Sequence, residues 1–344
     1  MEKIENQKGM RLVLLPVSPV GDGGYNKAVA LDIKKLNIDK NDQVIVYNHG
    51  NQKVPENFNC IQRPNKFSSE RILNTLLLRP STDLLVSSLA NKVSGATFSG
   101  IFCGDVMMYK ATRKLFPNIE ISVRFHNLFS LALKRQKVRR MTRNLKFNFN
   151  LFIFSRLESI ILNDRKAYPI FINDIEQKFF ELMFPGRESS VWSPIVSNQV
   201  FPTYPRKPDF VYFGSHAHHQ TPGIKKFISE VFQPLKNRWP TINFHLWGRG
   251  GAEYHCPSKG ILHHGDYNGE SIPMAGEGLF INPDLLGGGV KFKVLEWLEN
   301  GIAFISTPYG VEGYSFKPNR NIIVAEIFDW IKQIESYFKE AKLI

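Results

Sequence analysis

Short apolar runs alternate with segments of helical periodicity along the first part of the chain. Four runs have the length and composition of buried strands: 11–17, 44–48, 98–103 and 121–125. Helical spacing of apolar residues over 25–36 and 67–78 predicts helices between some of these strands. Because strands that alternate with helices form parallel sheets covered on both faces, this part of the chain predicts an α/β domain.

The same alternation begins again after a proline-containing segment at 197–208, which has little periodicity and suits a hinge. Beyond it, apolar runs predict strands at 209–214, 242–248, 260–265, 279–282 and 302–306. Helical spacing predicts helices over 223–239 and 289–300. The sequence therefore predicts two α/β domains, one over residues 1–197 and one over residues 198–344.

Composition limits the class of protein. The chain has 344 residues and 43% hydrophobic content, which is enough for two cores of ordinary size. No apolar run reaches the roughly 18 residues of a membrane span, and the N-terminus lacks the apolar stretch of a secretion signal. We therefore expect a cytoplasmic protein. Cys60, Cys103 and Cys256 lie far apart, so neither a zinc site nor a disulfide framework is expected.

The formal net charge of +13 favours anionic partners: nucleic acid, phosphorylated ligands or the negative face of a membrane. Basic residues concentrate in the segment 131–154, which has no acidic residue and many large apolar side chains. They are Lys134, Arg135, Lys137, Arg139, Arg140, Arg143 and Lys146. This composition is typical of a helix that lies on an anionic bilayer, where each basic residue adds about 1 kcal/mol. A solvated basic helix is the alternative, and no nucleic-acid motif accompanies the segment.

Ligands of open parallel sheets bind at the carboxyl ends of the strands, so we expect the functional residues in the loops that follow the predicted strands. The loop VGDGGYNKA at 20–28 carries Gly23 and Gly24 at a helix start, where bare backbone amides can approach an anion. It matches neither a dinucleotide-binding fingerprint nor a P-loop. A tight turn without a ligand is the alternative.

Two further loops each carry one candidate side chain. In RFHN at 124–127, His126 ends a strand and can donate or accept a hydrogen bond near neutral pH, although a structural histidine is the alternative. In WGRGG at 247–251, Arg249 can bind a phosphate through two parallel hydrogen bonds, and the glycines leave room for the ligand. A surface turn with an incidental arginine is the alternative there.

The segment GGGVKFKVLEWLENG at 287–301 combines three adjacent glycines with a lysine-bearing helix. Backbone amides at a helix start, together with the helix dipole and nearby lysines, favour a phosphate. Glu296 follows Lys293 by three residues, so on one helix face it can accept hydrogen bonds from ribose hydroxyls while Lys293 neutralises a phosphate. A surface Lys/Glu pair is the alternative, but it leaves the glycines unexplained, since each costs about 1 kcal/mol in a helix.

Residues 209–325 resemble the second domain of the family 4 glycosyltransferases. The resemblance lies in WGRG, in NPDLLGGG and in the pattern K-x-L-E-x-x-x-x-G-x-x-x-x-x-T that begins at Lys293. The first domain matches the same family more weakly, through its Gly-Gly loop, RFHN and the segment FINDIEQKFF. The resemblance implies a GT-B fold, which consists of two facing Rossmann-like domains with parallel sheets covered by helices, and a retaining sugar transferase.

The resemblance also implies roles for single residues. It matches Glu296 to the glutamate that holds the nucleotide ribose, and His126 to the histidine near the transferred sugar. It assigns the donor nucleotide and diphosphate to Gly23, Gly24, Gly214, Ser215, Arg249, Gly287, Gly288, Gly289, Lys291 and Lys293.

This sequence departs from the family pattern in two places. Gly288 stands where many members carry a first glutamate, which puts contacts to the donor sugar hydroxyls in doubt. After the first strand of the second domain, His216, His218 and His219 stand in a loop where many members place a basic residue. Either these histidines bind the phosphate, or Arg249 and the lysines do so alone.

We therefore expect a glycosyltransferase that moves a sugar from a nucleoside diphosphate sugar to a hydroxyl of a glycan or lipid-linked acceptor. The expected setting is bacterial-type surface polysaccharide assembly at the inner face of the cell membrane. We expect no cofactor and no metal ion, because lysine, arginine and helix ends can stabilise the leaving diphosphate. The leaving phosphate can take the acceptor's proton, while Asp22 and Asp105 remain candidate bases. The alternatives are a nucleotide-sugar epimerase, a phosphorylase or a non-enzymatic basic adaptor.

Overall fold

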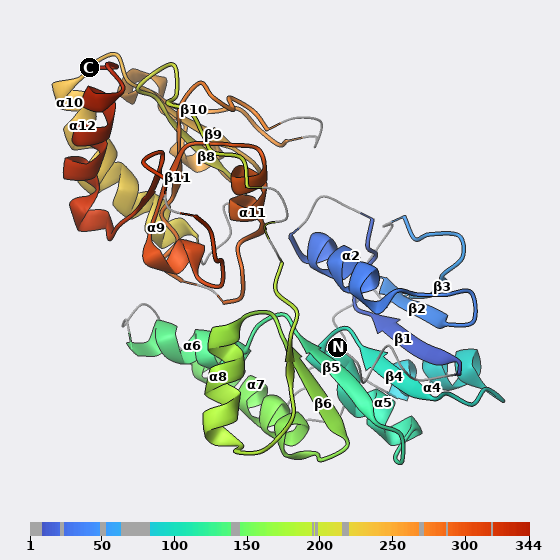
Figure 1. The fold of residues 1–344 in the computed structure, drawn as a ribbon. Coiled ribbons are helices and arrows are strands. Elements are labelled where there is room, and N and C mark those ends of the chain that lie inside the picture. Colours follow the sequence, from blue (N-terminus) through green and yellow to red (C-terminus); the bar gives the residue numbers. More distant parts are fainter. Residues whose placement is uncertain are drawn as a thin grey trace. The chain divides into compact units, whose positions relative to one another are not determined.

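The computed structural model describes the residues 9–20, 24–48, 53–62, 83–138, 145–194, 196, 199–214, 220–267, 272–286, 288–317 and 319–344. The chain divides into two compact units, Met1–Pro194 and Ile195–Ile344, drawn from blue to green and from yellow to red in Figure 1. The sequence predicted a domain boundary after residue 197. Each unit is described by itself.

The first unit contains a seven-stranded parallel sheet in the order β3-β2-β1-β4-β5-β6-β7. Its strands are β1 (Arg11–Leu15), β2 (Gln43–Asn48), β3 (Asn59–Gln62), β4 (Gly100–Cys103), β5 (Ile121–Phe125), β6 (Ala167–Phe171) and β7 (Ser190–Val191). The register aligns Val13 with Val44 on one side of β1 and with Phe102 on the other. The four predicted apolar runs form β1, β2, β4 and β5, whereas β3, β6 and β7 were not predicted.

Helices of the first unit pack on both faces of this sheet. They are α2 (Gly24–Leu36), α4 (Asp83–Val93), α5 (Tyr109–Leu115), α6 (Phe129–Val138), α7 (Leu145–Asn163) and α8 (Asp174–Met183). Alternate residues of β1 point to opposite faces. Val13 packs in the core beside α2, and Leu12 packs in the core that includes residues of α4, α5, α7 and α8. The predicted helix at 67–78 lies outside the described residues.

The second unit contains a six-stranded parallel sheet in the order β10-β9-β8-β11-β12-β13. Its strands are β8 (Phe210–Phe213), β9 (Phe244–Trp247), β10 (Ile261–His263), β11 (Leu279–Asn282), β12 (Phe304–Ser306) and β13 (Ile322–Val324). Its helices are α9 (Thr221–Phe227), α10 (Gln233–Arg238), α11 (Phe292–Glu299) and α12 (Trp330–Glu340). The five predicted strands of this domain are present, and β13 was not predicted.

A single helix was predicted over 223–239, but the structure divides that span. A π-helical turn at Ile228–Phe232 separates α9 from α10. Pro234 follows this turn and has no N–H to donate to a preceding carbonyl, which is a common cause of such irregularity. Ile224, Phe227 and Leu235 nevertheless all pack into one core.

Both sheets have the strand order of the doubly wound Rossmann fold, in which the direction of winding reverses beside the first strand. The reversal lies between β1 and β4 in the first unit and between β8 and β11 in the second. The predicted fold class, two parallel-sheet α/β domains covered by helices, is confirmed. The carboxyl ends of these four strands are the expected ligand edges.

Candidate functional site

A buried ion pair lies at the carboxyl edge of the second sheet. Asp284 follows β11 and Lys293 is the second residue of α11; Nζ of Lys293 lies 3.2 Å from Oδ2 of Asp284. Their side chains are 10% and 1% exposed, respectively. Nζ also lies 4.8 Å from the ring centre of Tyr212, on β8. Burial lowers the pKa of Lys293, and the Asp284 carboxylate opposes that shift.

Neither charged group has a hydrogen bond to a third group among the described residues. A lysine ammonium carries three donors, so at least two of these remain for a ligand. Burying an ion pair with so little hydrogen bonding is costly and adds little to fold stability. The pair lies at the carboxyl edge of the adjacent strands β8 and β11, between which the winding of the sheet reverses, and this is the expected ligand edge of such a fold.

The glycine-rich segment forms a loop before α11 and not the first turn of the helix. Gly289 has a φ of +59°, a left-handed conformation that a right-handed helix cannot contain, and α11 begins at Phe292. The predicted first residue of this helix, Gly289, was therefore wrong, because the helix begins three residues later. Nζ of Lys291 donates to the carbonyls of Gly288 and Gly289 at 3.2 Å each and lies 5.0 Å from the ring centre of Tyr309. Gly287 lies outside the described residues.

Glu296 lies on the same helix as Lys293, three residues further, and is half-buried. Residues three apart share a helix face, so its carboxylate projects on the side of the buried lysine. The hydroxyl of Tyr314 donates to the Lys291 carbonyl at 3.1 Å. Burial, followed by the nearby carboxylates of Glu296 and Glu299, raises the pKa of Tyr314. Glu296 therefore lies near the end of the glycine-rich loop.

Gly214 covers the buried pair from the end of β8. Its φ is +145°, a conformation that side-chain-bearing residues rarely adopt. A Cβ at this position would lie 3.6 Å from the hydroxyl of Tyr212 and 3.9 Å from Cδ of Lys293. Ser215 and the histidine-rich loop lie outside the described residues.

Arg249 follows β9, the strand next to β8, and does not reach the buried pair in this structure. Its side chain is 89% exposed, and Nε lies 3.8 Å from Oδ2 of the exposed Asp266. Gly248 and Gly250 have φ values of +116° and +86°, so glycine is required on both sides of the arginine. The guanidinium is therefore free to change rotamer and meet an anion from solvent.

In the first unit, His126 follows β5 and is buried. Its Nε2 lies 3.0 Å from the carbonyl oxygen of Gly104, which follows β4, and 3.4 Å from Oδ2 of Asp32 on α2. The ring of Tyr25 meets the imidazole edge-on at 4.9 Å between centres. Burial and the neighbouring Arg124 hold the pKa of His126 well below its ordinary value. Gly24 begins α2, whereas Gly23 lies outside the described residues.

The partners of His126 were not predicted from the sequence. Nε of Arg124 lies 2.9 Å from Oδ1 of Asp32, and both side chains are 2% exposed. The two terminal nitrogens of Arg124 donate to the carbonyls of Phe171 and Trp192 at 2.7 Å each. The available signal was a charge inside an apolar pattern: arginine within the strand ISVRF and aspartate within the helix segment VALDI.

Asp105, a candidate base, has both carboxylate oxygens occupied. Oδ1 accepts from the amide of Met107 at 2.7 Å, and Oδ2 accepts from the hydroxyl of Tyr25. These bonds cap the short helix at Val106–Met108 and tie the start of α2 to the loop after β4. The other candidate base, Asp22, lies outside the described residues.

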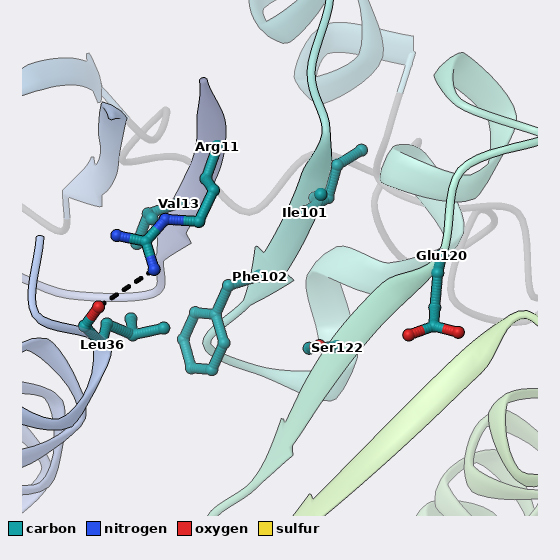
Figure 2. Close-up of a pocket in the computed structure, with 8 residues that line it drawn as sticks. Arg11, Val13, Leu36, Ile101, Phe102, Glu120 and Ser122 are labelled. Atoms are coloured by element: carbon teal, nitrogen blue, oxygen red, sulfur yellow. Dashed lines mark hydrogen bonds between the residues drawn. The ribbon is translucent and has the colours of Figure 1, made fainter. Parts of the chain in front are cut away.

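Figure 2 shows a pocket at the opposite edge of the first sheet, away from these candidate residues. Its lining includes Arg11 and Gly100, the first residues of β1 and β4, and Ser122, the second residue of β5. Arg11 donates there to the Leu36 carbonyl at 3.0 Å and pairs with Asp42. The charge of Arg11 in this pocket is therefore already neutralised.

The predicted basic helix is two helices, α6 and α7, in the described part of the chain. Lys134 is exposed and Arg135 is half-buried. The side chains of Lys137, Arg139, Arg140, Arg143 and Lys146 lie outside the described residues. No described helix combines the length and apolar character needed to cross a bilayer.

The first unit also exposes large apolar side chains on α7 and α8. Phe152 on α7 is 55% exposed. On α8 four large apolar side chains are exposed: Ile175, Phe179, Leu182 and Met183. Their spacing of four, three and one residues places them on one helix face. This face was not recognised in the sequence, because its pattern equally suits a helix that packs on a core.

The described residues contain no group of three or more His, Cys, Asp or Glu side chains able to hold a metal ion. Metal independence stays a prediction.

Comparisons with known proteins show the fold. No family model matches the sequence, and no curated protein matches it. Among solved structures, sucrose-phosphate synthase from Thermosynechococcus elongatus is 11% identical with a TM-score of 0.67, over 98% of this chain and 91% of that chain. WaaG, a glycosyltransferase involved in lipopolysaccharide biosynthesis, is 12% identical with a TM-score of 0.64, over 97% and 91%. Anabaena HepE in complex with UDP is 12% identical with a TM-score of 0.59, over 97% and 91%. The chain therefore has the GT-B fold.

Proposed function

We propose that the protein is a glycosyltransferase that moves a sugar from a nucleoside diphosphate sugar to a hydroxyl of an acceptor. The observation that carries the proposal is the buried Lys293–Asp284 pair at the carboxyl edge of the second sheet. Because its ammonium keeps donors without partners among the described residues, it suits an anionic ligand that displaces water. The GT-B fold, shared with a protein solved in complex with UDP, supports the same proposal.

In this proposal, Glu296 accepts hydrogen bonds from the ribose and Lys293 binds the diphosphate. Departure of the diphosphate builds negative charge as the glycosidic bond breaks, so cations and main-chain amides aimed at it stabilise the transition state. The loop with Gly288 and Gly289 supplies amides, and Arg249 can close on the phosphates from solvent. His126 contacts the transferred sugar.

The leaving phosphate takes the proton of the acceptor hydroxyl. Asp105 has a structural role in this assignment, because one of its carboxylate oxygens caps a short helix and the other accepts from the Tyr25 hydroxyl. Retention of configuration, membership of family 4, transfer of a hexose and independence of divalent metals are further parts of the proposal, which the sequence resemblance implies.

We propose a glycan or lipid-linked acceptor in surface polysaccharide assembly, reached at the inner face of the cell membrane. The exposed Lys134 on α6 and the apolar face of α8 support this, because exposed basic residues and apolar side chains gathered on one helix face each favour an anionic bilayer. Leu182, at 80% exposed, is the most accessible of these side chains. WaaG, which has the same fold, is involved in lipopolysaccharide biosynthesis.

Thermal shift with nucleoside diphosphates and their sugars tests the donor site. At least one diphosphate is expected to raise the Tm of the wild-type protein, because a ligand that binds only the folded state stabilises it. Glu296→Ala should weaken the binding of that nucleotide about 10- to 100-fold, because the hydrogen bonds to the Glu296 carboxylate are lost. Glu299→Ala, on the same helix, is the matched control and should bind as the wild type does.

Three outcomes would contradict the proposal. No nucleotide shift, together with binding to anionic vesicles, indicates a non-enzymatic adaptor. Turnover of a nucleotide sugar without any acceptor indicates an epimerase. Release of a sugar phosphate in inorganic phosphate indicates a phosphorylase.

A further inference from the structure

We infer that Asp32 and Arg124 are positioning residues that fix His126 in one tautomer, with its Nδ1 left as a hydrogen-bond acceptor for a hydroxyl of the transferred sugar. This inference rests on the proposed function and concerns residues to which neither the sequence pattern nor the comparisons give a role. It follows from three features of the first unit: the neighbours of Nε2, the anchoring of Arg124 and the state of Nδ1.

The neighbours of Nε2 determine where the imidazole proton resides. Nε2 lies 3.0 Å from the Gly104 carbonyl oxygen and 3.4 Å from Oδ2 of Asp32. A carbonyl and an ionised carboxylate can only accept hydrogen bonds. Nε2 must therefore carry the proton, because a lone pair facing two oxygen acceptors would be repelled. In the neutral ring Nδ1 then has no proton.

Arg124 holds the Asp32 carboxylate in place. It spans three fixed groups: Oδ1 of Asp32 at 2.9 Å and the carbonyls of Phe171 and Trp192 at 2.7 Å each. The guanidinium also lies 5.7 Å from the ring centre of Trp192. Burial raises the pKa of Asp32 to about 6 while Arg124 opposes the rise, so the arginine keeps this carboxylate available as an anion. A planar guanidinium with three fixed partners cannot rotate away.

Nδ1 of His126 is buried and has no hydrogen-bond partner among the described residues. Tyr25 contacts the ring edge-on, but its hydroxyl donates to Asp105 and is not the missing donor. A buried acceptor without a donor is unfavourable by about 1–3 kcal/mol and indicates a ligand group that completes it. A neutral lone pair attracts an O–H group and repels phosphate oxygens, so the expected donor is a sugar hydroxyl and not the diphosphate.

Other charged groups face this cluster and shape its pH response. Lys35 on α2 favours the ionised form of Asp32, and Glu176 on α8 favours the charged form of Arg124. Asp105 meets the cluster through Tyr25. Because burial and Arg124 hold the pKa of His126 well below 6.5, the ring remains neutral through the physiological range.

The first test measures the tautomer directly, without activity. A two-bond proton–nitrogen NMR spectrum of the ¹⁵N-histidine-labelled full chain should show His126 as the neutral Nε2–H form between pH 7 and 8, where Asp32 is ionised. Addition of the donor nucleotide sugar should shift the Nδ1 resonance, whereas the nucleoside diphosphate alone should not. A wild-type spectrum with the proton on Nδ1, or with a charged ring, would overturn the inference.

The second test uses Asp32→Asn, which removes the charge at nearly constant shape. Its amide can donate to Nε2 and favours the wrong tautomer. We expect kcat to fall about 10- to 100-fold, the range of one buried acceptor left unpaired, with little change in donor KM or in nucleoside diphosphate binding. Asp174→Asn, at an exposed aspartate on α8, is the matched control and should match the wild type.

The outcomes of the two tests remain separable. If Asp32→Asn lowers diphosphate binding as much as kcat, Asp32 is only structural and the inference fails. If neither the wild-type protein nor any variant binds a nucleotide sugar, the proposed function fails. The NMR spectrum of the wild-type protein still decides, independently, which tautomer His126 adopts. If Asp32→Asn does not fold, the wild-type spectrum decides the inference.

Discussion

Each unit buries a cation beside a carboxylate, and the two cations differ in the hydrogen bonds that they make to the backbone. Arg124 in the first unit meets the Asp32 carboxylate and donates to two main-chain carbonyls through its two terminal nitrogens. Lys293 in the second unit meets Asp284 and makes no hydrogen bond among the described residues. A guanidinium held by two backbone carbonyls keeps one orientation and suits the positioning of a neighbouring side chain, His126. An ammonium without such backbone partners can turn its donors toward a ligand.

The strongest way to break this comparison is to remove the lysine. Lys293→Met leaves the Asp284 carboxylate buried without a counter-ion, and we expect a loss of about 3–5 kcal/mol of unfolding free energy. The double variant Lys293→Met with Asp284→Leu should recover most of that stability, because both charges are gone. It should still fail to bind a nucleoside diphosphate. Urea unfolding followed by tryptophan fluorescence, with nucleotide titration, measures both quantities; a stable single variant would show that the pair is not effectively buried.

Glycines at the two ligand edges give the next largest effect. A Cβ at Gly223, on α9, would lie 1.9 Å from the carbonyl oxygen of Pro283, just before Asp284. A Cβ at Gly104 would lie 2.9 Å from the carbonyl oxygen of Leu14. Since the backbone must move further in the second unit, Gly223→Ala should cost about 3 kcal/mol, and Gly104→Ala about 1–2 kcal/mol. Thermal unfolding of both variants checks the order, and equal losses would contradict it.

Glu158 sharpens the comparison because burial favours the neutral form of its carboxyl group, while Lys134 opposes that effect. It accepts from the Ser130 amide, with both oxygens at 3.3 Å, and burial raises its pKa to about 7. A raised folded-state pKa stabilises the protein below the unfolded value, and this contribution is lost as pH rises through 7. Glu158→Gln should therefore be more stable than the wild type by about 2 kcal/mol above pH 8, and equal to it below pH 4. Unfolding at a series of pH values checks this; a constant difference would refute it.

The smallest expected effect on stability lies on α8. Leu182→Ser removes an 80% exposed side chain and should change unfolding free energy by less than about 0.5 kcal/mol. It should nevertheless weaken sedimentation with anionic vesicles, because apolar burial in the headgroup layer is lost. Ser159→Ala, at an exposed position on α7, is the control. Unchanged vesicle binding would remove α8 from the proposed membrane surface.

Much of the fold could be predicted because parallel strands buried on both faces are nearly continuous apolar runs, as in RLVLL of β1. The missed strands lack that signal. NCIQ of β3 is largely polar, and Pro169 in β6 argues against an interior strand. Their pairing with neighbours is decided by tertiary contacts, which a single sequence does not display.

The grouping of candidate residues was predictable where they lie close along the chain. Lys293 and Glu296 share one helix face and the glycines precede that helix, so spacing was sufficient to predict that they lie near one another. The partners Asp284 and Asp32 were missed, since each meets its cation through a contact between separate elements. The helix start was placed too early, because the left-handed φ of Gly289 is a loop property that composition does not reveal.

The π-helical turn before α10 holds one residue more than a regular helix would need over the same rise. Deleting the exposed Ser229 should therefore convert the turn to regular α-helix, while Phe227 and Leu235 remain buried in the core. The helical span from α9 to α10 can therefore lose one residue while both helices keep the faces that they bury in the core.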